Sequence, residues 1–215
     1  SEYIHKAIVL YNSINLPSKA DWCFNLLGLI KSQEKKFDSA FYYLSKSLAT
    51  NQSLSIAPNV SANCFNLGEL FLDQKNYAQA LRYYWRGLKI DIAIGDEYGQ
   101  CLFYNRLGRI YTQTNRFDSA KYYLEKAIAL AVPTSGTDIF RVNYIDMADY
   151  LQKTGKPELA LNYYKKYNLF SDSLFNKQKA QSQAAFEALY NIEKRENEIT
   201  ILQRTNELNQ SKLLV

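Results

Sequence analysis

The sequence predicts an all-α fold, a superhelix of antiparallel helix hairpins that continues into a long C-terminal helix. Residues of the same kind recur every 40 positions along most of the chain, as in Tyr3, Tyr43, Tyr83, Tyr123 and Tyr163. Small residues keep the same register: Ala40, Ala80, Ala120 and Ala160, and Gly28, Gly68, Gly108 and Ala148. Within each period, apolar residues follow the i, i+3, i+4, i+7 spacing of an amphipathic helix. A fixed period of this length is typical of solenoid proteins, which commonly present extended binding surfaces.

The composition is that of a globular protein with a mild positive charge. The chain has 215 residues, 47% of them hydrophobic, and its net charge is +5. Its lysines and arginines are scattered and form no block, so we expect this chain to contact no nucleic acid. It has no run of 18 apolar residues and no signal peptide, so we expect a membrane link only through parts outside this chain. We interpret Cys23, Cys64 and Cys101 as small apolar residues of the helices.

Residues 1–14 are predicted to form the second helix of a truncated repeat. They match the second helix of the next repeat at the same register: Tyr3, Lys6, Ala7 and Ile8 correspond to Tyr43, Lys46, Ser47 and Leu48. The chain is therefore expected to begin in mid-repeat, as a fragment with further repeats upstream.

The clearest repeat spans residues 101–132. Two apolar faces mark its two helices: Tyr104, Leu107, Gly108 and Tyr111 on the first, and Ala120, Tyr123, Leu124, Ala127 and Ile128 on the second. Asn115 and Arg116 form the turn, and Asp118 is expected to cap the second helix. Gly108 and Ala120 lie where the helices should cross most closely, because larger side chains would push the axes beyond about 8–10 Å.

This pattern resembles the tetratricopeptide repeat. The motif Tyr104-x2-Leu107-Gly108-x2-Tyr111, followed by Phe117-x2-Ala120-x2-Tyr123-Leu124, has counterparts in three other copies: Phe24, Leu27, Gly28, Phe37, Ala40, Tyr43 and Leu44; Leu67, Gly68, Phe71, Tyr77, Ala80, Tyr83 and Tyr84; and Tyr144, Met147, Ala148, Leu151, Ala160, Tyr163 and Tyr164. The resemblance implies four repeats over residues 15–170 and a non-catalytic module that binds a protein or peptide. The period is longer than the one usual in this family, which is roughly 34 residues. We assign the additional residues to longer helices and to inter-repeat loops such as residues 51–59.

In this family the first helix of each repeat lines a concave groove, and the resemblance places a protein or peptide ligand there. The groove residues carried over to this sequence are Trp22, Asn25, Leu29, Phe65, Asn66, Glu69, Asn105, Arg106, Arg109, Asp146, Asp149 and Lys153. Amides suit a peptide backbone and arginines suit carboxylates. The alternative is a solvated helix face, or internal pairing of Arg106 and Arg109 with Asp146 and Asp149.

The sequence predicts no catalytic site, no metal site and no cofactor. His5 is the only histidine, and a general base needs a positioned partner. No cluster of His, Cys, Asp and Glu has metal-ligand spacing. The carboxylate clamp of chaperone-tail-binding family members is not expected either, because only Asn66 and Arg106 fit among its five matching positions.

Residues 171–215 are predicted to form a capping helix that extends into a polar, signalling helix. A thin stripe with a seven-residue period, Ile192, Ile199, Asn206 and Leu213, favours a weak two-stranded coiled coil and hence a homodimer. The alternatives are docking on a neighbour or a partly disordered tail, because a polar helix with one thin apolar stripe is rarely stable alone.

Residues 171–180 and 190–199 resemble the junction in bacterial sensor proteins, where a repeat array outside the cytoplasm precedes a membrane span. A histidine kinase or transcription-regulatory output module lies beyond the span. The resemblance implies that this chain is the sensor portion of such a protein, on the periplasmic side of the inner membrane. The alternative is a cytoplasmic peptide-sensing regulator or assembly scaffold without a membrane link, and three unpaired cysteines weigh slightly towards it.

Overall fold

The computed structural model describes residues 2–131, 137–169, 171, 194–196 and 198–199. The chain divides into two units, Ser1–Tyr167 and Asn168–Val215. In the second unit, residues 194–196 are helical and exposed. The predicted coiled-coil positions Ile192, Asn206 and Leu213 lie outside the described residues.

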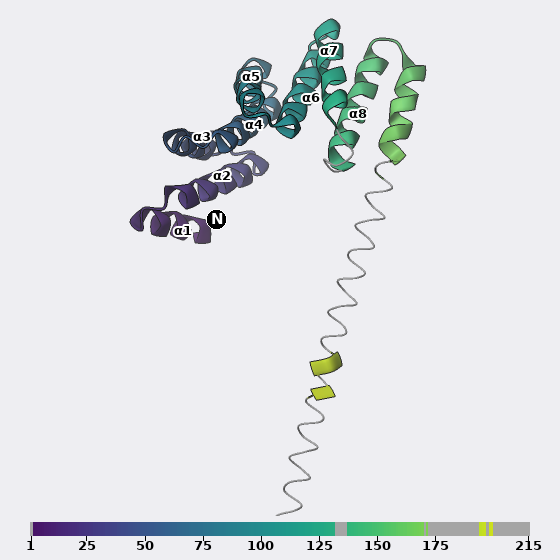
Figure 1. The fold of residues 1–215 in the computed structure, drawn as a ribbon. Helices are drawn as coiled ribbons and strands as arrows, with labels where there is room; N and C mark the ends of the chain where they lie inside the picture. Colours follow the sequence, from purple (N-terminus) through teal and green to yellow (C-terminus); the bar gives the residue numbers. More distant parts are fainter. Residues whose placement is uncertain (1, 132–136, 170, 172–193, 197, 200–215) are drawn as a thin grey trace, which may run out of the picture. The chain divides into compact units, whose positions relative to one another are not determined.

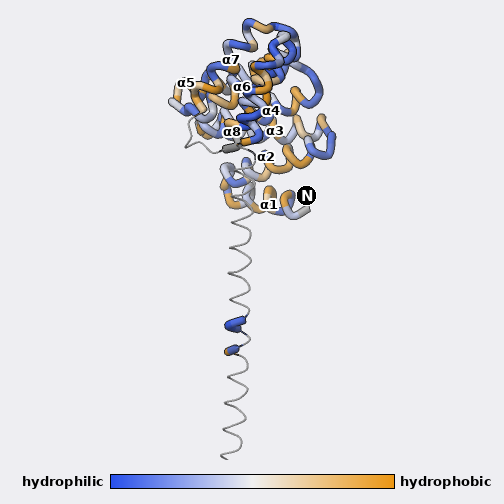
Figure 2. The backbone as a smooth tube through the Cα atoms, turned by 90° about the vertical axis from the view of Figure 1, so that its right-hand side faces the viewer, coloured by the Kyte–Doolittle hydropathy of each residue, from blue (hydrophilic) through white to orange (hydrophobic). Residues whose placement is uncertain are grey.

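The all-α prediction is confirmed: the described residues form helices that pack as successive antiparallel hairpins (Figure 1). The helices are α1 (Glu2–Ser13), α2 (Pro17–Gln33), α3 (Phe37–Ser53), α4 (Ala57–Asp73), α5 (Tyr77–Ile94), α6 (Glu97–Gln113), α7 (Phe117–Leu130) and α8 (Thr137–Lys153), followed by a helix over residues 157–169. Hydrophobic and hydrophilic residues are interspersed along the helices, as expected for amphipathic helices (Figure 2).

Each repeat period contains two helices, and successive helices start half a period apart. Helices α2 to α8 begin at evenly spaced positions, each half a period after the last: Pro17, Phe37, Ala57, Tyr77, Glu97, Phe117 and Thr137. The expected inter-repeat loop at residues 51–59 is wrong, because α3 continues to Ser53 and α4 begins at Ala57. The hydroxyls of Thr50 and Ser53 donate to the carbonyls of Lys46 and Thr50, at 3.0 and 2.7 Å, and support this last helical turn. The additional residues of the period therefore lengthen the helices.

Each described link between helices contains one residue with a left-handed backbone: Asn15, Lys35, Ser55, Lys75, Gly95, Asn115 and Gly155. The hydrogen bonds around it recur. In the first hairpin, the Lys36 amide donates to the Lys31 carbonyl at 2.9 Å, and the Lys35 amide donates to the Ser32 carbonyl at 2.8 Å. This is the Schellman motif, which satisfies the last carbonyls of a helix and stops it.

The prediction that Asp118 caps a helix is wrong. Helix α7 begins at Phe117, so Asp118 lies within its first turn and is not the cap. A carboxylate there still interacts favourably with the helix dipole. Side-chain caps occur elsewhere: Asn76 accepts from the Gln79 amide at 3.3 Å, and Asp96 accepts from the Gly99 amide at 3.0 Å.

The close helix crossing predicted for the small residues is confirmed. Ala40, Ala80 and Ala120 are fully buried. A Cβ atom on Gly108 would lie 2.6 Å from Leu124 Cγ and 3.1 Å from the Leu124 backbone nitrogen. The glycine at this register therefore faces the second helix of its own hairpin, one helical turn beyond the periodic alanine.

Buried polar side chains join the hairpin α2–α3 to α4. The Asn51 amide donates to Asn63 Oδ1 at 2.8 Å, and the Asn59 amide donates to Asn51 Oδ1 at 3.2 Å. Asn63 in turn donates to Ser47 Oγ at 2.7 Å, and the Ser47 hydroxyl donates to Asp21. The side chain of Asn51 is thus held by two amide neighbours on α4.

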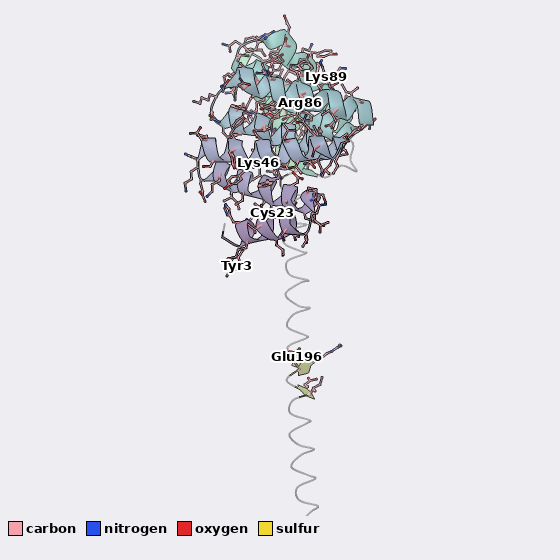
Figure 3. All side chains as sticks on the ribbon, turned by 90° about the vertical axis from the view of Figure 1, so that its left-hand side faces the viewer. Tyr3, Cys23, Lys46, Arg86, Lys89 and Glu196 are labelled. Carbon is pink, nitrogen blue, oxygen red and sulfur yellow. The ribbon has the colours of Figure 1, made fainter. Side chains whose placement is uncertain are left out.

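Cations of the 40-residue register lie on the second helices, where Figure 3 labels Lys46 on α3 and Arg86 on α5. Lys46 Nζ lies 5.4 Å from the ring centroid of Tyr42, and Lys126 Nζ lies 5.1 Å from that of Tyr122. Such exposed cation–π contacts contribute about 0.5–1 kcal/mol each. Lys46 and Lys126 of the register therefore each lie over an exposed tyrosine ring on their own helix.

Candidate peptide-binding groove

The candidate groove is formed by the first helices of the hairpins, α2, α4, α6 and α8. Helix α2 contacts α4, and α6 contacts α8, without an intervening second helix. Side chains that flank the packing stripe of one helix therefore meet those of the next. The structure pairs several of the predicted groove residues in this way.

The N-terminal part of the groove joins α2 to α4 through two amides. The Asn66 side chain donates to Asn25 Oδ1 at 2.8 Å. On the same helix as Asn25, Trp22 and Leu29 are exposed, with 64% of the Trp22 surface accessible. An exposed indole beside an ordered amide pair suits contact with a peptide.

The middle of the groove holds an ion pair between α4 and α6. Arg106 Nε lies 2.8 Å from Glu69 Oε1, the Arg106 guanidinium lies 5.5 Å from the Phe65 ring centroid, and the Tyr84 hydroxyl donates to Glu69. Burial opposes the charge on Arg106, but the Glu69 carboxylate outweighs it and raises the pKa of the guanidinium. Arg106 is therefore paired within the chain, but its ion-pair partner is Glu69 of the preceding hairpin and not Asp146 or Asp149.

Asn105 differs from the groove prediction because it is buried, with 1% of its surface accessible. Arg106 Nη1 donates to Asn105 Oδ1 at 2.7 Å, whereas Asn105 Nδ2 has no hydrogen-bond partner among the described residues. Asn105 and Asn143 line a small cavity of about 100 Å³ between α6 and α8. Asn105 thus points between the helices and supports Arg106.

A cavity of about 440 Å³ occupies the C-terminal part of the groove, between α6 and α8. Its lining residues are Arg109, Thr112, Gln113, Asp146, Asp149, Gln152 and Lys153, which include four predicted groove residues. Thr112 and Gln152 were not among the predicted residues, because their positions carry no recurrent signal. The two cations and two carboxylates of the lining balance in charge.

Asp146 and Thr112 are the buried residues of this lining, and Asp146 Oδ2 has no hydrogen-bond partner among the described residues. Burial raises the pKa of Asp146, the guanidinium groups of Arg109 and Arg106 and the side chain of Asn105 lower it, and Asp149 raises it. The Tyr164 hydroxyl donates to Asp149 Oδ1 at 3.1 Å, and Lys153 Nζ donates to the Thr112 carbonyl at 3.4 Å. The cavity therefore presents both signs of charge to a ligand.

The histidine, the cysteines and the acids are the groups that could carry other chemistry. Within the described residues, no group of three or more His, Cys, Asp and Glu side chains could hold a metal ion. His5 Nε2 lies 3.0 Å from the Tyr43 hydroxyl. Cys23, Cys64 and Cys101 are buried free thiols, and burial raises the pKa of Cys64 to about 11, which disfavours the reactive thiolate. No described helix is both long enough and apolar enough to cross a membrane.

The fold and the groove define a solenoid of helix hairpins. Residues 59–131 match the family model described as Tetratricopeptide repeat, which supports that family for this chain. No curated protein matches the sequence significantly. Among solved structures, the fold is similar to the crystal structure of BtubC (BKLC) from P. vanneervenii, with a TM-score of 0.63 and 17% identity. The match covers 74% of this chain and 65% of that one, and at this identity the similarity concerns the fold.

Tetratricopeptide repeats are generally non-enzymatic modules for protein interaction. The repeats therefore indicate a protein-interaction module for this chain.

Proposed function

We propose that this chain binds an extended peptide segment of a partner protein along α2, α4, α6 and α8. The observation that carries the proposal is the α6–α8 cavity, where the buried Asp146 carboxyl has an unpartnered oxygen beside the exposed Arg109 and Lys153. A buried polar group normally has a hydrogen-bond partner, so a ligand amide or cation is a natural complement. The Asn25–Asn66 pair and the exposed Trp22 extend this surface towards α2.

The proposal includes a role as the sensor portion of a larger bacterial signalling or transcription-regulatory protein. Support comes from the resemblance of residues 171–180 and 190–199 to the junction of such proteins. In that setting the repeats lie on the periplasmic side of the inner membrane, and binding is transmitted through the segment that follows residue 171.

A cytoplasmic regulator or assembly scaffold without a membrane link is the second candidate. The three buried free cysteines favour it, because a reducing compartment keeps thiols unpaired. The groove and its peptide ligand are common to both candidates.

The groove is tested by selecting phage-displayed random peptides on the 215-residue chain. Selected peptides are then titrated against Trp22→Ala and Arg109→Ala, two exposed groove variants, by fluorescence anisotropy. Truncating a contacted aromatic or arginine side chain commonly costs more than about 1 kcal/mol, so we expect weakening of at least about fivefold.

Two exposed variants on α7 serve as matched controls, Tyr122→Ala for the aromatic ring and Lys121→Ala for the cation. They should leave the affinity unchanged. If the selected peptides bind both groove variants as tightly as the parent chain, the groove is not the binding surface.

A further inference from the structure

A second cavity, here called the Asp91 cavity, lies between the N-terminal halves of α4 and α6, beside the last turn of α5, which carries Asp91. Its volume is about 220 Å³, and its lining includes Phe65, Asp91, Asp96, Tyr98, Leu102 and Phe103. This volume falls below the roughly 300–1,000 Å³ of cavities that enclose drug-sized ligands. It suits a single side chain with an apolar stem.

Asp91 is the unusual group in this cavity. Only 2% of its surface is accessible, and its Oδ1 has no hydrogen-bond partner among the described residues. Burial raises its pKa, a hydrogen bond with the Ser61 side chain lowers it, and the nearby Asp96 carboxylate raises it further. The described lining contains no Lys, Arg or His, and the neighbouring Arg106 is already paired with Glu69. A buried carboxylate without a cation is costly, so its persistence calls for a partner.

The 40-residue register explains why Asp91 lacks the two amide partners that its counterpart has one repeat earlier. Its counterpart one repeat earlier is Asn51, which is held by Asn59 and Asn63. The residues 40 positions after these two amides are Gly99 and Phe103, neither of which has a polar side chain. The later repeat thus has an acid where the earlier repeat has a neutral amide. It also lacks the two amide side chains that hold Asn51 in the earlier repeat.

Gly99 also creates the space that the two carboxylates share. A Cβ atom at this position would lie 2.7 Å from Asp91 Cγ and 2.9 Å from Asp96 Oδ2. Both acids therefore converge on the volume that a side chain at residue 99 would fill. Asp96 Oδ1 is engaged by the Gly99 amide at 3.0 Å, which fixes its orientation.

The α6–α8 cavity is a weaker candidate for a cation. Asp146 also has an unpartnered oxygen, but Arg109 and Arg106 interact with its charge, and Arg109 and Lys153 lie in the same lining. The Asp91 cavity combines two acids with an apolar and aromatic wall, and its described lining has no such compensation.

We propose that the Asp91 cavity binds a primary ammonium group on an aliphatic chain, namely a lysine side chain of the peptide in the groove. The stem would lie against Phe65, Leu102 and Phe103, and the ammonium would donate to the carboxylates of Asp91 and Asp96. An ammonium has three donors and no acceptor, which matches two converging carboxylates. The peptide source rests on the proposed function, because Phe65 and the neighbouring Asn66 belong to the groove.

The first experiment needs no variant. Three probes are titrated into the 215-residue chain and followed by the NMR signals of Tyr98, Gly99 and Leu102. The probes are n-butylamine, the capped pentapeptide Ala-Ala-Lys-Ala-Ala, and the same peptide with norleucine in place of lysine. We expect both amines to shift these signals and the norleucine peptide to leave them unchanged. Tighter binding of the lysine peptide than of n-butylamine supports the peptide source, and equal affinity overturns it.

Two variants test whether the ammonium binds beside Asp91 and Gly99. Asp91→Asn removes a charge-assisted hydrogen bond worth about 1.5–3 kcal/mol, so we expect weakening of at least about tenfold. Gly99→Ala keeps every charge, but its Cβ would collide with the Asp91 and Asp96 carboxylates and displace them, so it should also weaken binding. The matched control is Asp118→Asn, an exposed carboxylate on α7, which should bind the lysine peptide as the parent does.

A melting curve separates this role from a structural one. Because Asp91 is a buried charge without a described cation partner, Asp91→Asn should melt at or above the temperature of the parent chain. A lower melting temperature together with unchanged affinity would overturn the inference. If phage-selected peptides need Trp22 and Arg109 while the lysine peptide shifts nothing in the Asp91 cavity, the inference fails and the proposed function stands.

Discussion

Single residues in the links decide where each helix ends. Five of the described left-handed link residues are not glycine: Asn15, Lys35, Ser55, Lys75 and Asn115. The left-handed region costs an L-residue roughly 1–2 kcal/mol, and glycine avoids that cost. The Schellman hydrogen bonds hold these residues in place, so the links store a small amount of conformational strain.

We predict that Lys75→Gly stabilises the chain by up to about 1 kcal/mol, because glycine adopts the left-handed conformation without strain. The measurement is the urea midpoint of unfolding, followed by circular dichroism. Lys89→Gly is the matched control, since it places the same substitution within α5, where glycine costs about 1 kcal/mol. Equal loss of stability in both variants would contradict the argument.

The elements were largely predictable because the residues that pack them repeat. The periodic alanines, glycines and tyrosines indicated the hairpins and their crossing points from the sequence alone. The partners of groove side chains were not predictable, because adjacent positions on a helix differ by about 100° in direction. Asn105 and Arg106 show this, since the first is buried between α6 and α8 and the second reaches Glu69 on α4. The unpartnered Asp91 could have been found by comparing Asn51, Asn59 and Asn63 with the residues one period later.

We predict that Gly108→Ala destabilises the hairpin α6–α7 by about 1–3 kcal/mol, although alanine favours helices, because its Cβ would meet Leu124. Leu124→Ala alone should also destabilise by leaving a cavity. Truncating Leu124 makes room for the Cβ added at residue 108, and that Cβ fills part of the cavity. The double variant should therefore be more stable than the sum of the single effects predicts. Thermal unfolding of the four proteins completes the cycle, and strict additivity would show that the two side chains do not compete for space.

At the scale of the whole molecule, the proposed signalling role depends on the second unit, Asn168–Val215. In this proposal the repeats supply a surface for a ligand, and the homodimer predicted from the sequence would supply a way to transmit its binding. Ile199 is the described member of the seven-residue stripe, and it is exposed within the chain. An exposed apolar residue on a polar helix is consistent with contact between two copies.

We predict that the 215-residue chain dimerises at high concentration and that Ile199→Asp abolishes the dimer, because a charge in the apolar stripe opposes helix pairing. Sedimentation equilibrium measures the association. Lys194→Asp lies off the stripe and also introduces an acid, so it should retain the dimer. A parent chain that stays monomeric at the highest soluble concentration would contradict the pairing.

The uniform spacing of the helix starts has a consequence for changes in chain length. Every described link has a left-handed residue at the same position, so adding or removing one full period between link positions returns the next helix to the same layer and the same direction. A change of half a period reverses the direction of everything that follows and places a groove-lining helix in the outer layer. The array can therefore be lengthened, shortened or recombined only in whole hairpins, and a ligand site that spans two hairpins, such as the Asp91 cavity, travels only with both of them.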